Sequence, residues 1–149
     1  MLALGSKAPL EGSLESALES ALPMGKVLLV FFKISCPTCQ LALPFLERLH
    51  QSGQLAVYGI SQDKADATGE FARAFGLTFP ILLDSAASHY PASNAYGITT
   101  VPSLFLITAD RTVEWTLRGF ARNALADLGK AFGITMFRPG EQVPELKPG

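Results

Sequence analysis

Residues able to bind metals or to form disulfides are scarce in this sequence. Its 149 residues include two cysteines and two histidines, His50 and His89. Two cysteines are too few for a scaffold held together by disulfides. A zinc site on the cysteines would need a second pair of ligands, and the histidines lack metal-like spacing. A copper carrier that uses both cysteines and His89 stays open as an alternative.

An excess of charge of one sign is also missing. Lys and Arg number 12 against 13 Asp and Glu, so the net charge is −1, and no basic run occurs. The electrostatics therefore indicate neither nucleic acid nor a membrane surface as a partner. With 48% hydrophobic and 17% charged residues, the composition is typical of a globular protein and not of a disordered one.

Long hydrophobic stretches are absent as well. No apolar run approaches the roughly 18 residues of a membrane span. Residues 1–12 lack the basic start and the long apolar run of a signal peptide. We therefore expect a single domain over residues 1–149, with a core at about 5–132 and a C-terminal tail at 133–149. As the sequence stands we expect a cytoplasmic protein, or a periplasmic or envelope protein if a leader has been removed.

The two cysteines that are present carry the strongest signal. They stand three apart, in Cys36-Pro37-Thr38-Cys39. An apolar run over 27–32 leads into them, and a helix-like stretch over 40–50 follows. Two cysteines with this spacing, where a strand gives way to a helix, are typical of the dithiol site of a thioredoxin-like oxidoreductase.

A helix start would give the two cysteines different roles. Unpaired N–H groups and the positive end of the dipole at a helix N-terminus stabilise a thiolate, which is the nucleophile in disulfide exchange. Cys36 lies at or before the first helical residue, so we assign it as the attacking thiol. Cys39 lies one turn further on, where we expect it to be more buried and less acidic. It is assigned as the resolving thiol, which breaks the mixed disulfide.

Hydrophobic patterning predicts strands that alternate with helices around this site. The segment over 26–32, which is apolar without interruption from Val27 on, predicts a central strand buried on both faces. Strands separated by helices imply a parallel sheet covered on both faces, with one hairpin at the end. The predicted strands are 26–32, 55–61, 79–83, 103–108 and 112–118, and the predicted helices are 14–21, 36–53, 66–75, 88–96 and 121–132. The proline-containing tail after Gly133 has no periodicity, and we expect it to be loosely held.

Several further segments carry a resemblance to a known family. In Val101-Pro102, the proline precedes an apolar strand, a place where proline is tolerated without any special role. Together with the upstream cysteines, however, this proline is part of a pattern that resembles a known family. Over residues 5–132 the chain resembles the thioredoxin superfamily, and within it the TlpA/ResA-like redoxin group, related to the AhpC/TSA proteins. The other matching segments are Gly5-Ser6-Lys7-Ala8-Pro9, Lys26-Val27-Leu28-Leu29-Val30-Phe31-Phe32, Pro44, Tyr58-Gly59-Ile60-Ser61-Gln62-Asp63 and Phe79-Pro80-Ile81-Leu82-Leu83-Asp84.

The resemblance implies a fold and a set of site residues. The implied fold is a thioredoxin-like three-layer α/β/α sandwich with a central mixed sheet, and with an extra strand and helix inserted after Asp63. It also implies that Val101-Pro102 is a cis peptide bond facing the dithiol, and that the residue before the proline pairs its backbone with the substrate peptide. Pro37, Thr38, Val101 and Pro102 are therefore the predicted substrate-binding residues.

The chain departs from the family pattern around the dithiol. Ser35 stands where the family often has tryptophan, and Val30 stands where thioredoxins carry a buried acid. No proton-relay carboxylate is therefore evident. We interpret Asp63 and Glu70 as distant, solvated or capping residues. Lys33 is as easily a solvated lysine at a strand end as a partner of the thiolate.

These observations predict a thiol–disulfide oxidoreductase, with a lean towards a reductant because Pro37 and Thr38 bring no charge to the site. The expected partners are thiol- or disulfide-bearing protein substrates and a dithiol electron donor, and nothing indicates a bound cofactor. One alternative is a peroxiredoxin-like peroxidase, in which Cys36 becomes a sulfenic acid. Leu29 and Lys33, however, stand where the peroxidase motif has Pro and Thr or Ser. Another alternative is a non-enzymatic binding module for copper or for a thiol protein.

Overall fold

Five strands form the central sheet, in the order β3-β2-β1-β4-β5. A computed structural model describes all 149 residues. β2 is parallel to both β1 and β3, whereas β4 runs antiparallel to β1 and to β5. The sheet is therefore mixed, as the resemblance implied. The strands are β1 (Val27–Phe32), β2 (Ala56–Ser61), β3 (Ile81–Leu83), β4 (Ser103–Ile107) and β5 (Val113–Arg118).

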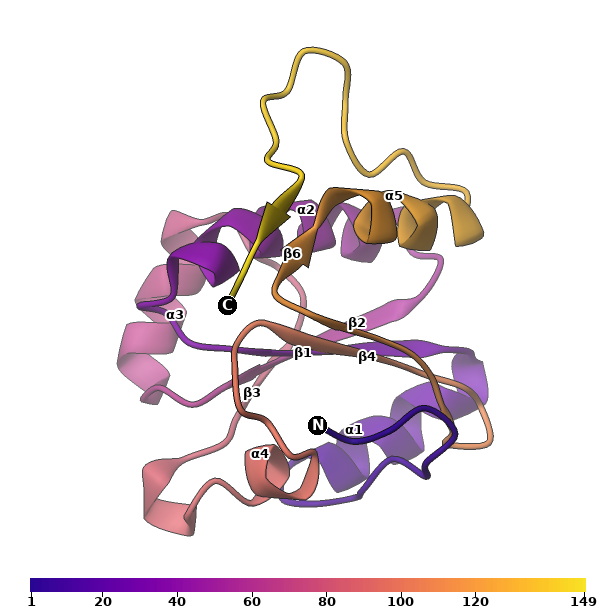
Figure 1. The fold of residues 1–149 in the computed structure, drawn as a ribbon. Coiled ribbons are helices and arrows are strands. Elements are labelled where there is room, and N and C mark those ends of the chain that lie inside the picture. The colour runs from indigo at the N-terminus through magenta and orange to yellow at the C-terminus, as the bar shows by residue number, and fades with distance from the viewer.

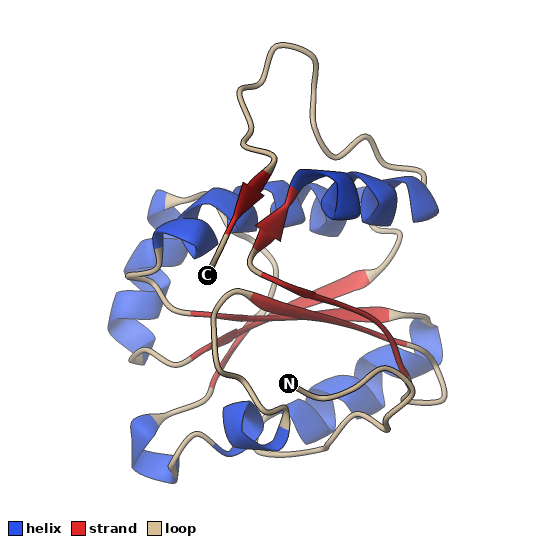
Figure 2. Cartoon of the chain, in the orientation of Figure 1, coloured by secondary structure: helices blue, strands red, loops and turns tan.

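Helices cover both faces of this sheet, so the fold has the three expected layers (Figures 1 and 2). One face carries α2, α3 and α5, and the other carries α1 and α4. None of the helices is both long and apolar enough to cross a membrane. The helices are α1 (Leu14–Ala21), α2 (Pro37–Ser52), α3 (Ala65–Ala74), α4 (Pro91–Ala95) and α5 (Arg122–Ala131), with 3-10 turns at Leu22–Met24 and Ala86–Ser88.

Strand β1 lies at the centre of both layers of the core. All six of its residues are fully buried, which confirms the predicted central strand. Successive side chains of a strand point to opposite faces, so Phe32 packs with Phe71 of α3 while Phe31 packs with Tyr96 and Phe105 on the other side. Burial on both faces fixes where β1 ends. The position of the cysteines that follow it is fixed with it.

Two predicted elements are shorter than the sequence pattern indicated. The helix expected over 88–96 is reduced to α4, because His89 and Tyr90 adopt positive φ angles of 61° and 50°, which an α-helix excludes. The strand expected over 79–83 begins at Ile81. The N–H of Phe79 is turned away from the sheet and donates to the carboxylate of Glu47 at 3.2 Å, and Pro80 has no N–H to give.

The tail after Gly133 contacts the rest of the fold although its sequence has no periodicity, and that it is loosely held stays a prediction. Met136 is 2% exposed, and its carbonyl oxygen accepts a hydrogen bond from Arg48 at 2.8 Å. The Arg48 guanidinium also holds Glu141 through two hydrogen bonds, of 2.8 and 2.5 Å. These bonds lower the pKa of Glu141 to about 2. Further on, β7 (Leu146–Lys147) pairs antiparallel with β6 (Phe120–Ala121). Partners on α2 and next to α5 contact the tail, and periodicity along the tail itself does not reveal them.

Candidate active site

Cys36 caps the N-terminus of α2. Its backbone is extended (φ −85°, ψ 115°), and its Sγ accepts a hydrogen bond from the N–H of Cys39 at 3.1 Å. Its carbonyl oxygen starts the helix by accepting the N–H of Gln40 at 3.0 Å. Pro37 takes the first helical position, where a missing N–H loses no bond. The sulfur of Cys36 therefore lies where unpaired N–H groups and the helix dipole favour a negative charge.

Cys39 has the opposite environment. Both cysteines are free thiols, but Cys36 is half-buried whereas Cys39 is fully buried. Burial raises the pKa of the Cys39 thiol far above its ordinary value, and the hydrogen bond with Cys36 and the charges of Cys36 and Asp63 raise it further. A hydrogen bond with the backbone of Lys33 works in the other direction. At neutral pH Cys39 is therefore a thiol, and Cys36 is the candidate nucleophile of the pair.

The loop that contains Val101 and Pro102 faces the sulfur of Cys36. The Cys36 thiol donates to the carbonyl oxygen of Val101 at 3.4 Å, and the peptide bond between Val101 and Pro102 is cis. Antiparallel pairing of β4 with β1 places Ser103 beside Phe31, so the start of β4 and the end of β1 meet at one edge. The N–H of Gly119 donates to the carbonyl oxygen of Pro102 at 2.8 Å. That bond fixes the loop to the segment that follows β5.

The two residues between the cysteines differ in exposure. Pro37 is exposed, whereas Thr38 is 3% exposed. The Thr38 hydroxyl donates to the carbonyl oxygen of Pro148 at 2.6 Å, so the tail lies directly on the site. The resemblance predicted Thr38 as a substrate-binding residue. That role stays a prediction for Thr38, as it does for Pro37, Val101 and Pro102. The structure shows that Cys36, Thr38 and Val101 share one edge, which we call the dithiol edge.

Asp63 belongs to the same edge and is not the distant residue that we expected. Its Oδ2 accepts a hydrogen bond from the N–H of Ile34 at 2.8 Å, in the turn between β1 and α2. Its negative charge also contributes to the raised pKa of Cys39. Asp63 follows β2, which is parallel to β1, and the carboxyl ends of neighbouring parallel strands meet at the same edge of a sheet. This rule could have been used to predict from the sequence that Asp63 lies near Cys36.

The other charged candidates near the dithiol lie on the surface. Lys33 is exposed and forms no ion pair. It lines a small cavity of about 110 Å³ together with Gln62, Thr99 and Val101. Glu70 on α3 is exposed and has no hydrogen-bond partner. Neither side chain therefore forms a hydrogen bond with the two sulfur atoms, and Lys33 reaches Cys39 through its backbone alone.

Histidines do not gather near the dithiol. His50 lies in the last turn of α2, with its ring 6.3 Å from that of Phe79. His89 is exposed and follows the 3-10 turn after β3. No group of three or more His, Cys, Asp or Glu side chains lies close enough together to hold a metal ion.

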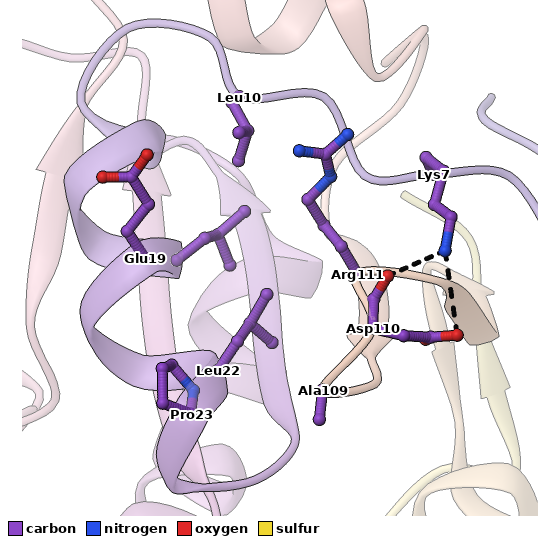
Figure 3. A pocket seen from close by; sticks show the side chains of 9 residues that line it. Lys7, Leu10, Glu19, Leu22, Pro23, Ala109, Asp110 and Arg111 are labelled. Carbon is purple, nitrogen blue, oxygen red and sulfur yellow. Dashed lines mark hydrogen bonds and ion pairs between the residues drawn. The ribbon is translucent and has the colours of Figure 1, made fainter.

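A larger cavity lies away from the dithiol edge (Figure 3). It measures about 460 Å³ and opens between α1 and the turn that joins β4 to β5. Lys7, Glu19 and Arg111 project around it, and Lys7 is paired with Asp110. Because β4 runs antiparallel to β1, this turn lies at the end of the sheet opposite the cysteines. The cavity is therefore separate from the dithiol edge, and we call this second region the far edge.

Comparison with known proteins places this chain in a family and finds relatives named as thiol-disulfide oxidoreductases. Residues 11–116 match the model of the AhpC/TSA family. A protein named thiol-disulfide oxidoreductase ResA, from Geobacillus thermodenitrificans, is 31% identical over 98 residues, which are 62% of this chain and 54% of that protein. The chain thus spans about half the length of the curated relatives that it matches.

Solved structures show the same fold. The thioredoxin domain of a thiol-disulfide oxidoreductase from Bacteroides vulgatus superposes with a TM-score of 0.71 at 19% identity, covering 89% of this chain and 99% of that one. A secreted disulfide oxidoreductase from Mycobacterium tuberculosis superposes with a TM-score of 0.59 at 19% identity, covering 69% and 78%. At these identities the likeness supports a thioredoxin-like fold.

Proposed function

Because the chain belongs to the AhpC/TSA family, we propose that it is a thiol–disulfide oxidoreductase that uses Cys36 and Cys39. The observation that carries this proposal is the contrast between the two thiols. One sulfur is half-exposed at a helix N-terminus beside a cis-proline loop, and the other is buried one turn behind it. A relative that matches 62% of this chain bears the name of this activity.

The proposed exchange has two steps. The Cys36 thiolate attacks one sulfur of a substrate disulfide, forms a mixed disulfide with it, and releases the other sulfur as a thiolate. The Cys39 thiol then loses its proton and attacks the sulfur of Cys36. This forms the Cys36–Cys39 disulfide, releases the second substrate sulfur as a thiolate, and completes a transfer of two electrons to the substrate. A dithiol donor restores the two thiols by the reverse exchange.

The order of these steps follows from the charges. A negative charge on Cys36 is one cause of the raised pKa of Cys39. Once Cys36 is bound in the mixed disulfide, that charge is gone, so the pKa of Cys39 falls. Cys39 thereby becomes easier to ionise at the stage when it has to attack.

The proposed partner is a polypeptide that carries a disulfide or a thiol. Val101 and Pro102 would contact its backbone beside the reacting sulfur, and Pro37 and Thr38 would contact it from the helix. We propose that the chain acts as a reductant, because no charged group stands between the cysteines. For the compartment we propose the periplasm or cell envelope, supported by the secreted protein among the structures of similar fold.

The test is to trap the mixed disulfide. In a Cys39→Ser variant the second step is blocked, so incubation with a protein disulfide should accumulate a covalent adduct on Cys36 that mass spectrometry detects. The Cys36→Ser variant is the matched control and should form none. Equal labelling of the two variants, or of neither, would refute the assignment.

A second measurement separates the candidate activities. The reduction potential of the pair should lie near the thioredoxin value of about −270 mV for a reductant, and nearer about −120 mV for an oxidant. The family match also keeps peroxide as a substrate to be tested. We expect no peroxide turnover, since Leu29 and Lys33 replace the peroxidase residues. Turnover that outpaces the reduction of protein disulfides would replace the oxidoreductase by a thiol peroxidase.

A further inference from the structure

The last seven residues of the sequence, 143–149, run along the dithiol edge. Figure 1 shows the tail in yellow, which loops away from α5 and returns beside β6. We call residues 143–149 the tail strand. The N–H of Arg122 donates to the carbonyl oxygen of Glu145 at 2.9 Å, and its guanidinium donates to that of Val143 at 3.2 Å. Next to these bonds, Leu146–Lys147 of the tail strand pairs antiparallel with β6. Addition of a strand in this way is common when a protein binds an extended peptide.

Three contacts bring the tail strand onto the dithiol edge, two of them at residues proposed to bind the substrate. The Thr38 hydroxyl donates to the carbonyl oxygen of Pro148. Gly149 lies so close to Val101 that a Cβ on Gly149 would overlap the Val101 carbonyl oxygen. Gly119, with φ +75°, lies so close to the tail that a Cβ there would come within 2.9 Å of the Lys147 carbonyl oxygen. The backbone of the tail strand therefore fills the place where a partner backbone would pair with Val101.

From these contacts we propose that the tail strand is an intramolecular competitor for the peptide-binding groove beside the dithiol, formed by Thr38, Val101, Gly119 and β6. The inference rests on the proposed function, because Thr38 and Val101 of this groove are assigned there to contact a polypeptide partner. The tail strand occupies the groove as an extended peptide would, and a partner polypeptide has to displace it before its backbone reaches Val101. Small disulfides need no such displacement, since Cys36 itself is half-exposed.

The attachment of the tail strand suits a reversible cover. Its β7 side chains are not buried, and Leu146 is 71% exposed. Val143 packs against the core, but the other contacts are hydrogen bonds from Arg122 and Thr38 to carbonyl oxygens of the tail strand and its pairing with β6. Each such bond contributes little to net stability. A binding site that is free only part of the time binds its partner more weakly in proportion, so a groove free one tenth of the time lowers the apparent affinity about tenfold.

The first test displaces the tail strand from the groove without substituting any of the proposed binding residues. Gly149→Val adds a side chain that clashes with the Val101 carbonyl, and Leu146→Ala is the matched control, because it changes an exposed side chain of the same strand. Both are made in the full chain with Cys39→Ser, which leaves Cys36 as the single thiol. Cys36 then displaces the coloured nitrothiobenzoate thiolate from an activated cysteine in an extended peptide, or from the small symmetrical dinitrobenzoate disulfide.

We expect Gly149→Val to speed the peptide reaction about tenfold and to leave the reaction with the small disulfide within about twofold. Leu146→Ala should match the parent chain in both reactions. Equal peptide rates in all three chains would overturn the proposal, as would an equal acceleration of both reactions by Gly149→Val.

A second measurement needs no substitution in the tail. Hydrogen exchange is compared for the Cys39→Ser chain with Cys36 joined either to the peptide or to a methylthio group. With the peptide bound, the Arg122 amide, which donates to Glu145, and the β7 amides should exchange faster than with the methylthio group. Equal protection in the two adducts would overturn the proposal. Both measurements need only a reactive Cys36, so they decide the role of the tail strand even if the chain fails to turn over protein disulfides.

Discussion

The dithiol edge and the far edge of the sheet differ in how their polar groups are used. At the far edge, Lys7 pairs with Asp110 and Lys26 pairs with Glu114, all of them exposed side chains. At the dithiol edge, the polar contacts are partly buried and pair a side chain with the backbone: Cys36 with Val101 and Asp63 with Ile34. Exposed ion pairs are screened by water and add little stability. Partly buried contacts hold their atoms in fixed positions.

This contrast shows that the size of a cavity is a poor guide to the site in this fold. The far edge has the larger cavity, about 460 Å³ against about 110 Å³ beside Val101. The reactive sulfur, however, lies where a helix N-terminus, the end of a buried strand and the cis-proline loop meet. Reaction with another protein needs an accessible sulfur and a backbone to pair with, and neither requires a deep pocket. Substitutions at the dithiol edge or along α2 should therefore alter the chemistry or the stability of the protein, whereas substitutions at the far edge should change little.

The largest effect is expected from Cys36→Ser. Loss of the attacking sulfur should lower the reduction of a protein disulfide by at least about a thousandfold. The free energy of unfolding should change by less than about 1 kcal/mol, since Cys36 is half-buried. The measurements are a turnover assay and denaturant unfolding. Ser35→Ala, on the exposed neighbour, is the control and should retain activity. Substantial activity in Cys36→Ser would show that the nucleophile lies elsewhere.

The next effect concerns the stability of the fold further along α2, away from Cys36. Glu47 is 8% exposed and accepts hydrogen bonds from Gln51 and from the backbone of Thr78 and Phe79. Burial alone would raise the pKa of Glu47, but these hydrogen bonds and that of the Thr78 hydroxyl lower it below its ordinary value. Glu47→Gln should therefore cost about 1–3 kcal/mol of unfolding free energy at pH 7 and leave the chemistry of the dithiol intact.

The pH dependence of Glu47→Gln has a defined sign. A carboxyl with a lowered pKa contributes stability above its unfolded pKa of about 4.3, and this contribution is lost as the pH falls through the folded pKa. The difference between parent and variant should therefore shrink as the pH falls below about 4. Denaturant unfolding over this range checks it. A difference that is independent of pH would point to lost packing instead of lost charge.

A smaller effect is expected from Asp63→Asn, which preserves an oxygen for the Ile34 N–H. Removal of the negative charge should lower the pKa of Cys39, because that charge is one of the causes that raise it. The resolving step should then reach a given rate at a lower pH. Stopped-flow release of a peptide from the mixed disulfide measures this shift. Asp110→Asn at the far edge is the matched control and should change nothing. A slower resolving step would instead indicate that Asp63 accepts the proton of Cys39.

The smallest effect is expected at the far edge. Lys26 and Glu114 approach to 2.7 Å, but both side chains are exposed, so Lys26→Met should change the unfolding free energy by less than about 1 kcal/mol. Turnover should stay at the level of the parent chain. Urea unfolding and the same disulfide assay check both statements. A loss of activity would show that the two edges are coupled and that the contrast between them fails.

The parts of the fold that could be predicted from the sequence are those with a local cause. The apolar run of β1, with no polar interruption, predicted burial on both faces. Pro37 after Cys36 predicted the start of α2. The positive φ angles of His89 and Tyr90, which shorten α4, had no such signal, because neither residue type requires them. The contacts of the tail could not be predicted because its partners, such as Arg48, lie far away in the chain.

Three features of the site follow from local sequence: the spacing of the two cysteines, the helix start that distinguishes them and the strand that leads into them. These features depend on neighbours within a few residues, and local periodicity and propensity report on such neighbours. The family resemblance already implied that Val101 faces Cys36, which lies 65 positions away. The folded chain was needed to show that Asp63 reaches Ile34 across 29 positions and that Pro148 covers Thr38 across 110. Such contacts depend on the order of strands in the sheet and on where each loop closes, because only the packed core brings distant segments of the chain to the same edge.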